Sequence, residues 1–260
     1  KGTYIVMSAS KGIMLQGKSA IVTGASRGIG REIALAFAEN GADLIINGTD
    51  DAKLESLKTE VLTRGVRCAY KAGDVGLPET AEALSRLCID RFGKIDILVN
   101  NAGINSRVPF LELSNDEWKR MFAVNTDSVF YLCKAVLPYM IQARSGCIIN
   151  ISSTASKTAH PTASISYGAS KAAVNSMTQK LALEMGEHHI RVNGICPGPI
   201  LTDMSSQWTD EYRMAVVKKI PLGVIGSAKN VADVAVFLGS DMAAFINGET
   251  INVNGGSYMN

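Results

Sequence analysis

The chain has 260 residues, 47% of them hydrophobic, which is long enough to bury the core of one large α/β domain. Its 26 basic and 24 acidic residues leave a formal net charge of +2, a near balance that argues against nucleic-acid or membrane-surface partners. No apolar run is long enough to cross a membrane. The five cysteines lack CxxC spacing and the three histidines do not form a metal-ligand pattern. We therefore expect no metal site, and reduced thiols as in a cytoplasmic protein.

Residues 1–14 differ in character from the rest of the chain. The stretch KGTYIVMSASKG is irregular and its apolar run is too short for a signal peptide, so we expect a tag remnant or a disordered tail. Residues 15–260 are expected to form a single domain, since no linker, repeat or low-complexity segment divides them.

Apolar runs and helical stripes alternate along this domain. The runs predicted to be strands are residues 18–24, 43–47, 66–75, 94–103, 146–153, 190–198 and 248–256. The predicted helices span residues 31–42, 51–65, 78–93, 115–143 (entered through a shorter helix), 167–186 and 228–240. This alternation predicts a doubly wound (Rossmann) α/β fold, a seven-stranded parallel sheet with helices on both faces. Residues 198–222 break the pattern and are interpreted as a long functional loop or lid.

The first predicted strand is followed by TGASRGIG, residues 23–30, which opens the first helix. Its glycines let the backbone turn sharply and let a pyrophosphate approach the N–H groups at the helix N-terminus. A place between a first strand and a helix is the context that a dinucleotide-binding loop requires. We expect this loop to contact the cofactor through Gly24, Ser26, Arg27, Gly28, Ile29 and Gly30.

The end of the second strand indicates which dinucleotide is bound. NAD-specific sites usually place an acidic residue there for the ribose 2′-hydroxyl. Here Gly48 and Thr49 occupy that place and Asp50 follows, while Arg27 could meet a 2′-phosphate. NADP(H) is therefore favoured, with Thr49 as a contact. NAD(H) is the alternative if the strand extends to Asp50.

A tyrosine and a lysine stand one helical turn apart in SYGASKAAV, residues 166–174. Tyr167 and Lys171 share a face of the predicted helix, and small residues fill most positions around them. In a doubly wound sheet, ligands lie beyond the carboxyl ends of the strands, where the glycine loop, residues 100–103, Ser153 and residues 197–198 all fall. We expect these segments to converge on one cleft.

The order of these motifs resembles that of the short-chain dehydrogenases/reductases, from about Leu15 to the C-terminus. The matching motifs are TGASRGIG, the GDV that contains Asp74, NNAG at 100–103, AVNT with Asn125, Ser153, Tyr167-x-x-x-Lys171 and Pro197-Gly198. Their ordered conjunction is far more specific than any one of them. The interval from Ser153 to Tyr167 is one residue longer than is usual in the family, so we expect an insertion between them.

The resemblance implies transfer of a hydride between a nicotinamide cofactor and a ketone or secondary alcohol. Tyr167 would be the acid–base group, since the Lys171 ammonium should lower the phenol pKa, and Lys171 would also hold the nicotinamide ribose. Ser153 would donate a hydrogen bond to the substrate oxygen. Asn125 would anchor a water that relays protons to Lys171.

The resemblance also assigns further contacts around the cofactor, and no metal ion takes part in the chemistry that it implies. The expected contacts are Asp74 and Val75 at the adenine, Asn101, Ala102 and Gly103 at the ribose, Pro197 and Gly198 in the turn after the sixth strand, and Ile200 and Thr202 at the carboxamide.

Two substrate classes fit the resemblance. The tail GETINVNGGSYM resembles 3-oxoacyl-ACP reductases, and Arg144 and His188 fall near positions where those enzymes carry basic residues for the acidic carrier protein. NNAGINSRVPFLEL and INGTD resemble gluconate 5-dehydrogenase, in which Arg107 would meet a substrate carboxylate. A 3-oxoacyl thioester reductase is favoured over a sugar-acid or polyol dehydrogenase. A non-catalytic nucleotide-sensing protein is the third alternative, and the presence of Tyr167 and Lys171 argues against it.

The predicted helices over 117–143 and 167–186 are rich in apolar and small residues on more than one face. One face can pack on the sheet, and the other needs a partner. Related enzymes assemble through these helices. We therefore expect a cytoplasmic homotetramer that acts on a small-molecule ketone or alcohol, which an acyl carrier protein could deliver.

Overall fold

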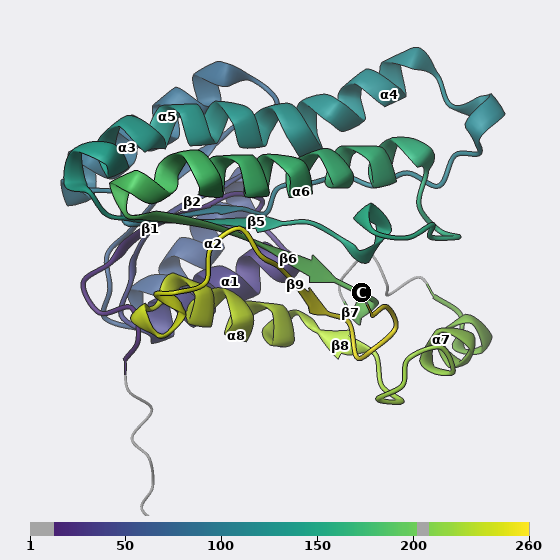
Figure 1. Ribbon diagram of the computed structural model, residues 1–260. Coiled ribbons are helices and arrows are strands. Elements are labelled where there is room, and N and C mark those ends of the chain that lie inside the picture. The colour runs from purple at the N-terminus through teal and green to yellow at the C-terminus, as the bar shows by residue number, and fades with distance from the viewer. Residues whose placement is uncertain (1–12, 202–207, 260) are drawn as a thin grey trace, which may run out of the picture.

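The computed structural model describes residues 13–201 and 208–259, and these form a seven-stranded parallel sheet between two layers of helices (Figure 1). The strand order is β3-β2-β1-β4-β5-β6-β9, and all neighbours run parallel. The predicted doubly wound sheet is confirmed. Its strands are β1 (Ser19–Val22), β2 (Asp43–Gly48), β3 (Cys68–Ala72), β4 (Ile97–Asn100), β5 (Gly146–Ile151), β6 (Ile190–Pro197) and β9 (Thr250–Val253).

Alternate residues of the central strands face opposite sides of the sheet. In β1, Ile21 is in register with Ile45 of β2 and Leu98 of β4, and all three belong to one apolar core. The neighbours of Ile21 in the strand, Ala20 and Val22, belong to the core on the other face. Because helices cover both faces, both sets of side chains are buried, and the strands read as unbroken apolar runs.

The helices form one layer on each face of the sheet. The first layer contains α3 (Pro78–Phe92), α5 (Ser128–Ala143) and α6 (Ile165–Met185), and the second contains α1 (Gly28–Glu39), α2 (Asp51–Leu62) and α8 (Ala228–Gly239). Short 3-10 helices lie at Phe110–Glu112, Thr154–Ser156, Gly186–His188 and Asp241–Ala243. Within the described ranges, no helix has the length and apolar character needed to cross a bilayer.

The helical stretch predicted over 115–143 is divided. Its first part, α4 (Asn115–Phe122), begins with a capping box between Ser114 and Glu117, and a π-helical segment at Ala123–Asp127 separates it from α5. A π-helical turn closes i→i+5 hydrogen bonds, occurs mostly as a single turn within an α-helix and is frequent at functional sites. Asn125, which was singled out by its motif, lies in the middle of this segment.

The stretch 198–222, interpreted as a loop, contains regular structure, and that interpretation was wrong for part of it. β7 (Ile200–Leu201) pairs with β8 (Gly226–Ser227), and α7 (Asp210–Val217) is capped by the Thr209 side chain. α7 has no buried residue, so it lacks the buried apolar face that the other helices pack against the core. Residues 202–207 of the expected lid lie outside the described residues.

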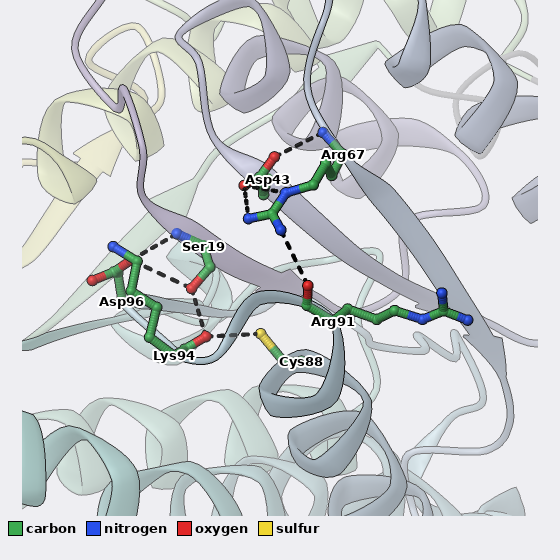
Figure 2. A network of polar contacts seen from close by, with 7 residues as sticks. All are labelled: Ser19, Asp43, Arg67, Cys88, Arg91, Lys94 and Asp96. Carbon is green, nitrogen blue, oxygen red and sulfur yellow. Dashed lines mark hydrogen bonds and ion pairs between the residues drawn. The ribbon is translucent and has the colours of Figure 1, made fainter.

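Polar contacts fasten the amino ends of the strands (Figure 2). Asp96, just before β4, accepts hydrogen bonds from the Ser19 N–H at 2.7 Å and the Ser19 hydroxyl at 3.3 Å. Arg67, just before β3, binds the Asp43 carboxylate of β2 at 2.7 Å and the Arg91 carbonyl of α3 at 3.2 Å. These contacts tie neighbouring strands together at the edge of the sheet opposite their carboxyl ends.

Candidate active site

The carboxyl ends of the strands open into a cleft of about 500 Å³. Ligands of open α/β sheets bind at this edge, where the strand order reverses, here between β1 and β4. Of the residues predicted from the sequence, the cleft brings together Gly24, Ser26, Arg27, Gly28, Ile29, Gly30, Thr49, Asp74, Val75, Asn101, Ala102, Gly103, Arg107, Ser153, Tyr167, Lys171, Pro197, Gly198 and Ile200. Asn125 does not line it, and Thr202 lies outside the described residues.

The glycine loop is in close contact with the loop after β4. Gly24 has a φ of +64°, and a Cβ there would lie 2.7 Å from the Ala102 Cα, so only glycine fits. The Asn101 side chain donates to the Thr23 and Gly24 carbonyls at 2.8 and 3.1 Å. Arg27, the residue before α1, gives that helix no side-chain cap. The first N–H groups of α1 are therefore available to an anion in the cleft.

β2 ends at Gly48, one residue beyond the predicted strand and short of Asp50, and Thr49 lines the cleft directly after it. A Cβ on Gly48 would lie 2.9 Å from the Ser26 hydroxyl, so the strand end is in contact with the glycine loop. Asp50 is instead the N-cap of α2, where it accepts a hydrogen bond from the Lys53 N–H at 3.1 Å and pairs with the Lys53 ammonium at 3.4 Å. Asp50 does not line the cleft.

Ser153 stands at the carboxyl end of β5. It begins the 3-10 turn Thr154–Ser156, and its hydroxyl accepts a hydrogen bond from the Ala155 N–H at 3.1 Å. Ser153 also acts on the Tyr167 phenol, whose pKa its hydroxyl lowers, and both residues line the cleft. The sequence motifs were expected to converge on one cleft, and the structure places this hydroxyl and this phenol in the same cleft.

Lys171 lies one turn after Tyr167 on α6 and is almost completely buried, with 4% of its surface exposed. Its ammonium donates a hydrogen bond to the Ile151 carbonyl, the last of β5, at 2.7 Å. Burial lowers the pKa of Lys171 to about 8, and the nearby Cys196 acts weakly in the opposite direction. The ammonium can thus lose its proton much more easily than a lysine in water.

Burial has the opposite effect on Tyr167. It raises the pKa of the phenol, against the hydrogen bond from Ser153, which lowers it. The expectation that Lys171 lowers the Tyr167 pKa was therefore wrong for this structure. The physical reason is burial: removing the phenolate from water outweighs the effect of Ser153, and no effect of Lys171 on the phenol is resolved.

Asn125 lies behind the cleft. Its side-chain oxygen accepts from the Ile104 N–H at 2.8 Å, and its nitrogen donates to the Ile104 carbonyl at 2.9 Å and to the Ser170 hydroxyl at 3.1 Å. A Cβ on Gly103 would lie 3.3 Å from the Lys171 Nζ and 3.4 Å from the Asn125 Oδ1. The Lys171 Nζ and the Asn125 Oδ1 thus both border the space that a side chain on residue 103 would occupy.

Asp74 closes the other end of the cleft together with a residue that the sequence did not single out. Arg120 of α4 pairs with the Asp74 carboxylate at 2.6 Å and also lines the cleft. Burial alone would raise the pKa of Asp74, but hydrogen bonds from Arg120 and from the Gly76 N–H outweigh it, and the pKa is lowered. Asp74 therefore stays ionised beside the expected adenine position.

Two segments contribute lining residues that sequence reasoning missed. Tyr212 and Val216 come from α7 and Trp208 lies two residues before it, and the two rings meet edge to face at 5.1 Å. Their spacing of four residues is a helical stripe that could have identified them. His160 comes from the longer interval between Ser153 and Tyr167, and burial, with a smaller effect of Lys219, lowers its pKa.

The residues considered for a carrier protein lie elsewhere. The Arg144 guanidinium donates to the carbonyl of Glu187, the neighbour of His188, at 3.2 Å, so these two expected basic positions are close together. Arg144 ends α5 just before β5 begins, which places it at the amino edge of the sheet. Within one chain, this pair is at the opposite edge from the cleft.

The burial of Lys171 has a measurable effect on stability. The unfolded chain holds the lysine proton up to a pKa of 10.5, whereas the folded chain releases it above about 8. Between these values the free energy of unfolding should rise with pH relative to that of Lys171→Met, by up to about 1.4 kcal/mol per pH unit. Urea unfolding of both proteins at several pH values checks this, and a pH-independent difference would contradict it.

The comparisons with known proteins agree with this geometry. A family model described as enoyl-(acyl carrier protein) reductase matches residues 24–258. The 3-oxoacyl-[acyl-carrier-protein] reductase FabG of Vibrio cholerae is 40% identical over 245 residues, which cover 94% of this chain and 99% of that protein. The protein of the same name from Staphylococcus aureus is 37% identical over 243 residues, 93% of this chain and 98% of that one.

Solved structures show the same fold. A 3-oxoacyl-[acyl-carrier protein] reductase from Brucella melitensis matches with a TM-score of 0.91 at 36% identity, covering 96% of this chain and 94% of that one. A candidate gluconate dehydrogenase from Agrobacterium tumefaciens matches with a TM-score of 0.89 at 34% identity, covering 94% and 97%. With a glycine loop at one end of its cleft and a serine, a tyrosine and a lysine at the other, the chain belongs to the short-chain dehydrogenase/reductase family, and it is a nicotinamide-dependent oxidoreductase of CH–OH and keto groups.

Proposed function

We propose that this oxidoreductase reduces the 3-oxo group of an acyl thioester with NADPH, and that Ser153, Tyr167 and Lys171 carry out the proton chemistry. One observation supports this most strongly. The same cleft joins a glycine loop suited to a pyrophosphate with a hydroxyl, a phenol and a buried ammonium suited to a ketone oxygen. The identity to proteins named as 3-oxoacyl-[acyl-carrier-protein] reductases favours the thioester.

The first part of the mechanism concerns the substrate oxygen. A bound nicotinamide dinucleotide would supply the hydride that reaches the carbonyl carbon. The Ser153 hydroxyl stabilises the charge that develops on the oxygen, and the Tyr167 phenol transfers its proton there. Because burial raises the pKa of Tyr167, the phenol is protonated at neutral pH, which suits the direction of reduction.

The second part returns a proton to the tyrosine. The Lys171 ammonium, with a pKa of about 8, is a better acid than the Tyr167 phenol and can reprotonate the phenolate one turn away. Asn125 acts behind this pair, where it fixes the Ile104 backbone and the Ser170 hydroxyl. Its role with a relay water, implied by the resemblance, is part of this proposal.

Initial rates with acetoacetyl-coenzyme A and with keto-gluconates, each with NADPH and NADH, test the proposed substrate. We expect acetoacetyl-coenzyme A to be the better substrate. Tyr167→Phe should lower its turnover to below a few per cent and leave cofactor affinity nearly unchanged, because only the proton donor is lost. Turnover retained in Tyr167→Phe would show that this phenol is not the acid.

A sugar acid is the second candidate substrate, and a specific feature favours it. Arg107 is an exposed cation that lines the cleft, and it could pair with a carboxylate. The Trp208 indole N–H is buried beside the cleft with no hydrogen-bond partner among the described residues, so it could serve a polar substrate. Faster reduction of keto-gluconates in the same screen would select this candidate.

The surroundings of the β2 end support NADPH over NADH. Thr49 can donate a hydrogen bond to a 2′-phosphate, and Arg27 is exposed beside it in the glycine loop. Next to Arg27 is a smaller hollow that Arg31 and Lys53 also line. The carboxylate that would repel a 2′-phosphate, Asp50, is bound to Lys53 at the start of α2, outside the cleft.

Cofactor preference can be tested by fluorescence titration of both reduced dinucleotides. A charge-assisted contact contributes about 1.5–3 kcal/mol, or roughly tenfold or more in affinity. Arg27→Ala should therefore weaken NADPH binding by at least that factor and NADH binding far less, and Thr49→Asp should shift preference to NADH. If the unmutated enzyme binds NADH more tightly, the assignment of NADPH is wrong.

We infer that the outer faces of α5 and α6 are buried in a homotetramer. Phe130 on α5 is 51% exposed, and Ile165 and Leu183 on α6 are 53% and 77% exposed. The opposite faces of these helices pack on the sheet, so the exposed apolar side chains need another chain to cover them.

Light scattering at micromolar concentration should give about four times the mass of one chain. A monomer would contradict the inference. Leu183→Glu should weaken the assembly.

The five cysteines, Cys68, Cys88, Cys133, Cys147 and Cys196, are free thiols. Burial raises the pKa values of Cys88 and Cys133 to about 12, so these thiols are unreactive. We propose that the protein is located in the reducing cytoplasm, and the absence of disulfides among its five cysteines supports this.

A further inference from the structure

A chain of hydrogen bonds runs from α6 to the backbone of Ser153. The Asn175 side-chain nitrogen donates to the Ser156 hydroxyl at 2.7 Å. The Ser156 hydroxyl donates to the Ser153 carbonyl at 2.5 Å, and the Ser156 N–H reaches the same carbonyl at 3.0 Å. Two donors from one residue therefore close the 3-10 turn that begins at Ser153.

The direction of these bonds matters. A hydroxyl has one proton to donate, and Ser156 can give it to Ser153 because Asn175 approaches its oxygen as a donor. The Asn175 contact therefore leaves the Ser156 proton directed at the Ser153 carbonyl. The single hydroxyl proton of Ser152, the residue after β5, has two acceptors within reach, the Lys171 carbonyl at 3.2 Å and the Ser156 oxygen at 3.3 Å.

Asn175 lies on the same face of α6 as the reacting groups. Tyr167, Lys171 and Asn175 are spaced by four residues, so their side chains form one stripe along the helix. Lys171 hydrogen-bonds to the Ile151 carbonyl at the end of β5, and Asn175 hydrogen-bonds to Ser156 in the turn that follows β5. The backbone between Ser153 and Tyr167 instead passes through a partly exposed turn around His160. Asn175 thus links, through Ser156, the helix that carries Tyr167 to the turn that carries Ser153.

The asparagine is poorly explained by stability alone. Its side-chain oxygen is buried and has no hydrogen-bond partner within the described part of the chain. A buried polar atom without a partner costs about 1–3 kcal/mol. An apolar residue of similar size would avoid that cost but could not donate to Ser156.

We propose that Asn175, acting through Ser156, is a positioning residue that fixes the Ser153 hydroxyl relative to the Tyr167 phenol. The inference rests on the proposed function of Ser153 and Tyr167. It goes further by adding two residues that touch neither substrate nor cofactor. Loss of either one moves Ser153 away from the position where its hydroxyl and the phenol meet the same oxygen.

The test compares Asn175→Leu and Ser156→Ala with the parent enzyme, using acetoacetyl-coenzyme A and NADPH. A displacement near 1 Å can cost about a hundredfold in rate, so kcat should fall about tenfold to a hundredfold. The NADPH dissociation constant should stay unchanged. Asn175→Leu should not lower the melting temperature, because it removes the unpaired oxygen, and Ser156→Thr should restore kcat because it keeps the hydroxyl.

Thr178→Val is the matched control. Thr178 lies on the same helix and accepts a buried hydrogen bond from Asn150 at 2.8 Å, and its hydroxyl donates to the Val174 carbonyl rather than to the Ser153 turn. This variant should lower stability and leave kcat unchanged. Parent-like kcat in both Asn175→Leu and Ser156→Ala would overturn the proposal. A kcat that falls only in proportion to melting temperature, in Thr178→Val as well, would overturn it too.

A crystal structure of Asn175→Leu separates this inference from the proposed substrate. Catalytic groups must be held within about 0.5 Å, so Ser153 should be displaced from Tyr167 by more than that distance. If acetoacetyl-coenzyme A is not reduced by the parent enzyme, the substrate proposal fails and the crystal structure alone decides. An unmoved Ser153 would overturn the positioning role.

Discussion

The hydrogen bond between the Lys171 ammonium and the Ile151 carbonyl is the contact on which the rest of the site depends. An ammonium taken out of water is costly unless polar groups surround it, and the end of β5 provides one at 2.7 Å. The bond fixes the first turns of α6 against the sheet. Tyr167, one turn earlier, is thereby held near Ser153, the second residue after β5. The chemistry is thus built at a junction of helix and strand, on rigid elements.

One physical cause, desolvation of the charged form, shifts the two titrating groups in opposite directions. It raises the pKa of the Tyr167 phenol and lowers that of Lys171 to about 8. In the proposed mechanism, the phenol therefore keeps its proton until the substrate oxygen takes it, and the lysine can replace that proton. At the other end of the cleft the design is different. There, Gly24 of the glycine loop packs closely against Ala102. Because no side chain caps α1, the first N–H groups of this helix are available to an anion.

The fold and much of the site could be predicted because they follow from patterns local in the sequence. Continuous apolar runs and helical stripes gave the sheet and its layers, and ordered motifs gave the residues around the cleft. α7 was missed because its residues bury no apolar stripe, although the spacing of Trp208 and Tyr212 was a usable signal. The pKa direction at Tyr167 depends on burial, which no motif encodes. The contact between Asn175 and Ser156 joins a helix to a turn 19 positions away and is visible only in three dimensions.

The central claim is that this cleft transfers a hydride to a ketone whose oxygen is protonated by Tyr167. The most direct measurement uses NADPH deuterated at either face of nicotinamide C4, with acetoacetyl-coenzyme A as the acceptor and mass spectrometry of the product. The account predicts that one of the two labelled cofactors places deuterium on C3 of a 3-hydroxybutyryl thioester. A product without deuterium from either cofactor would contradict it.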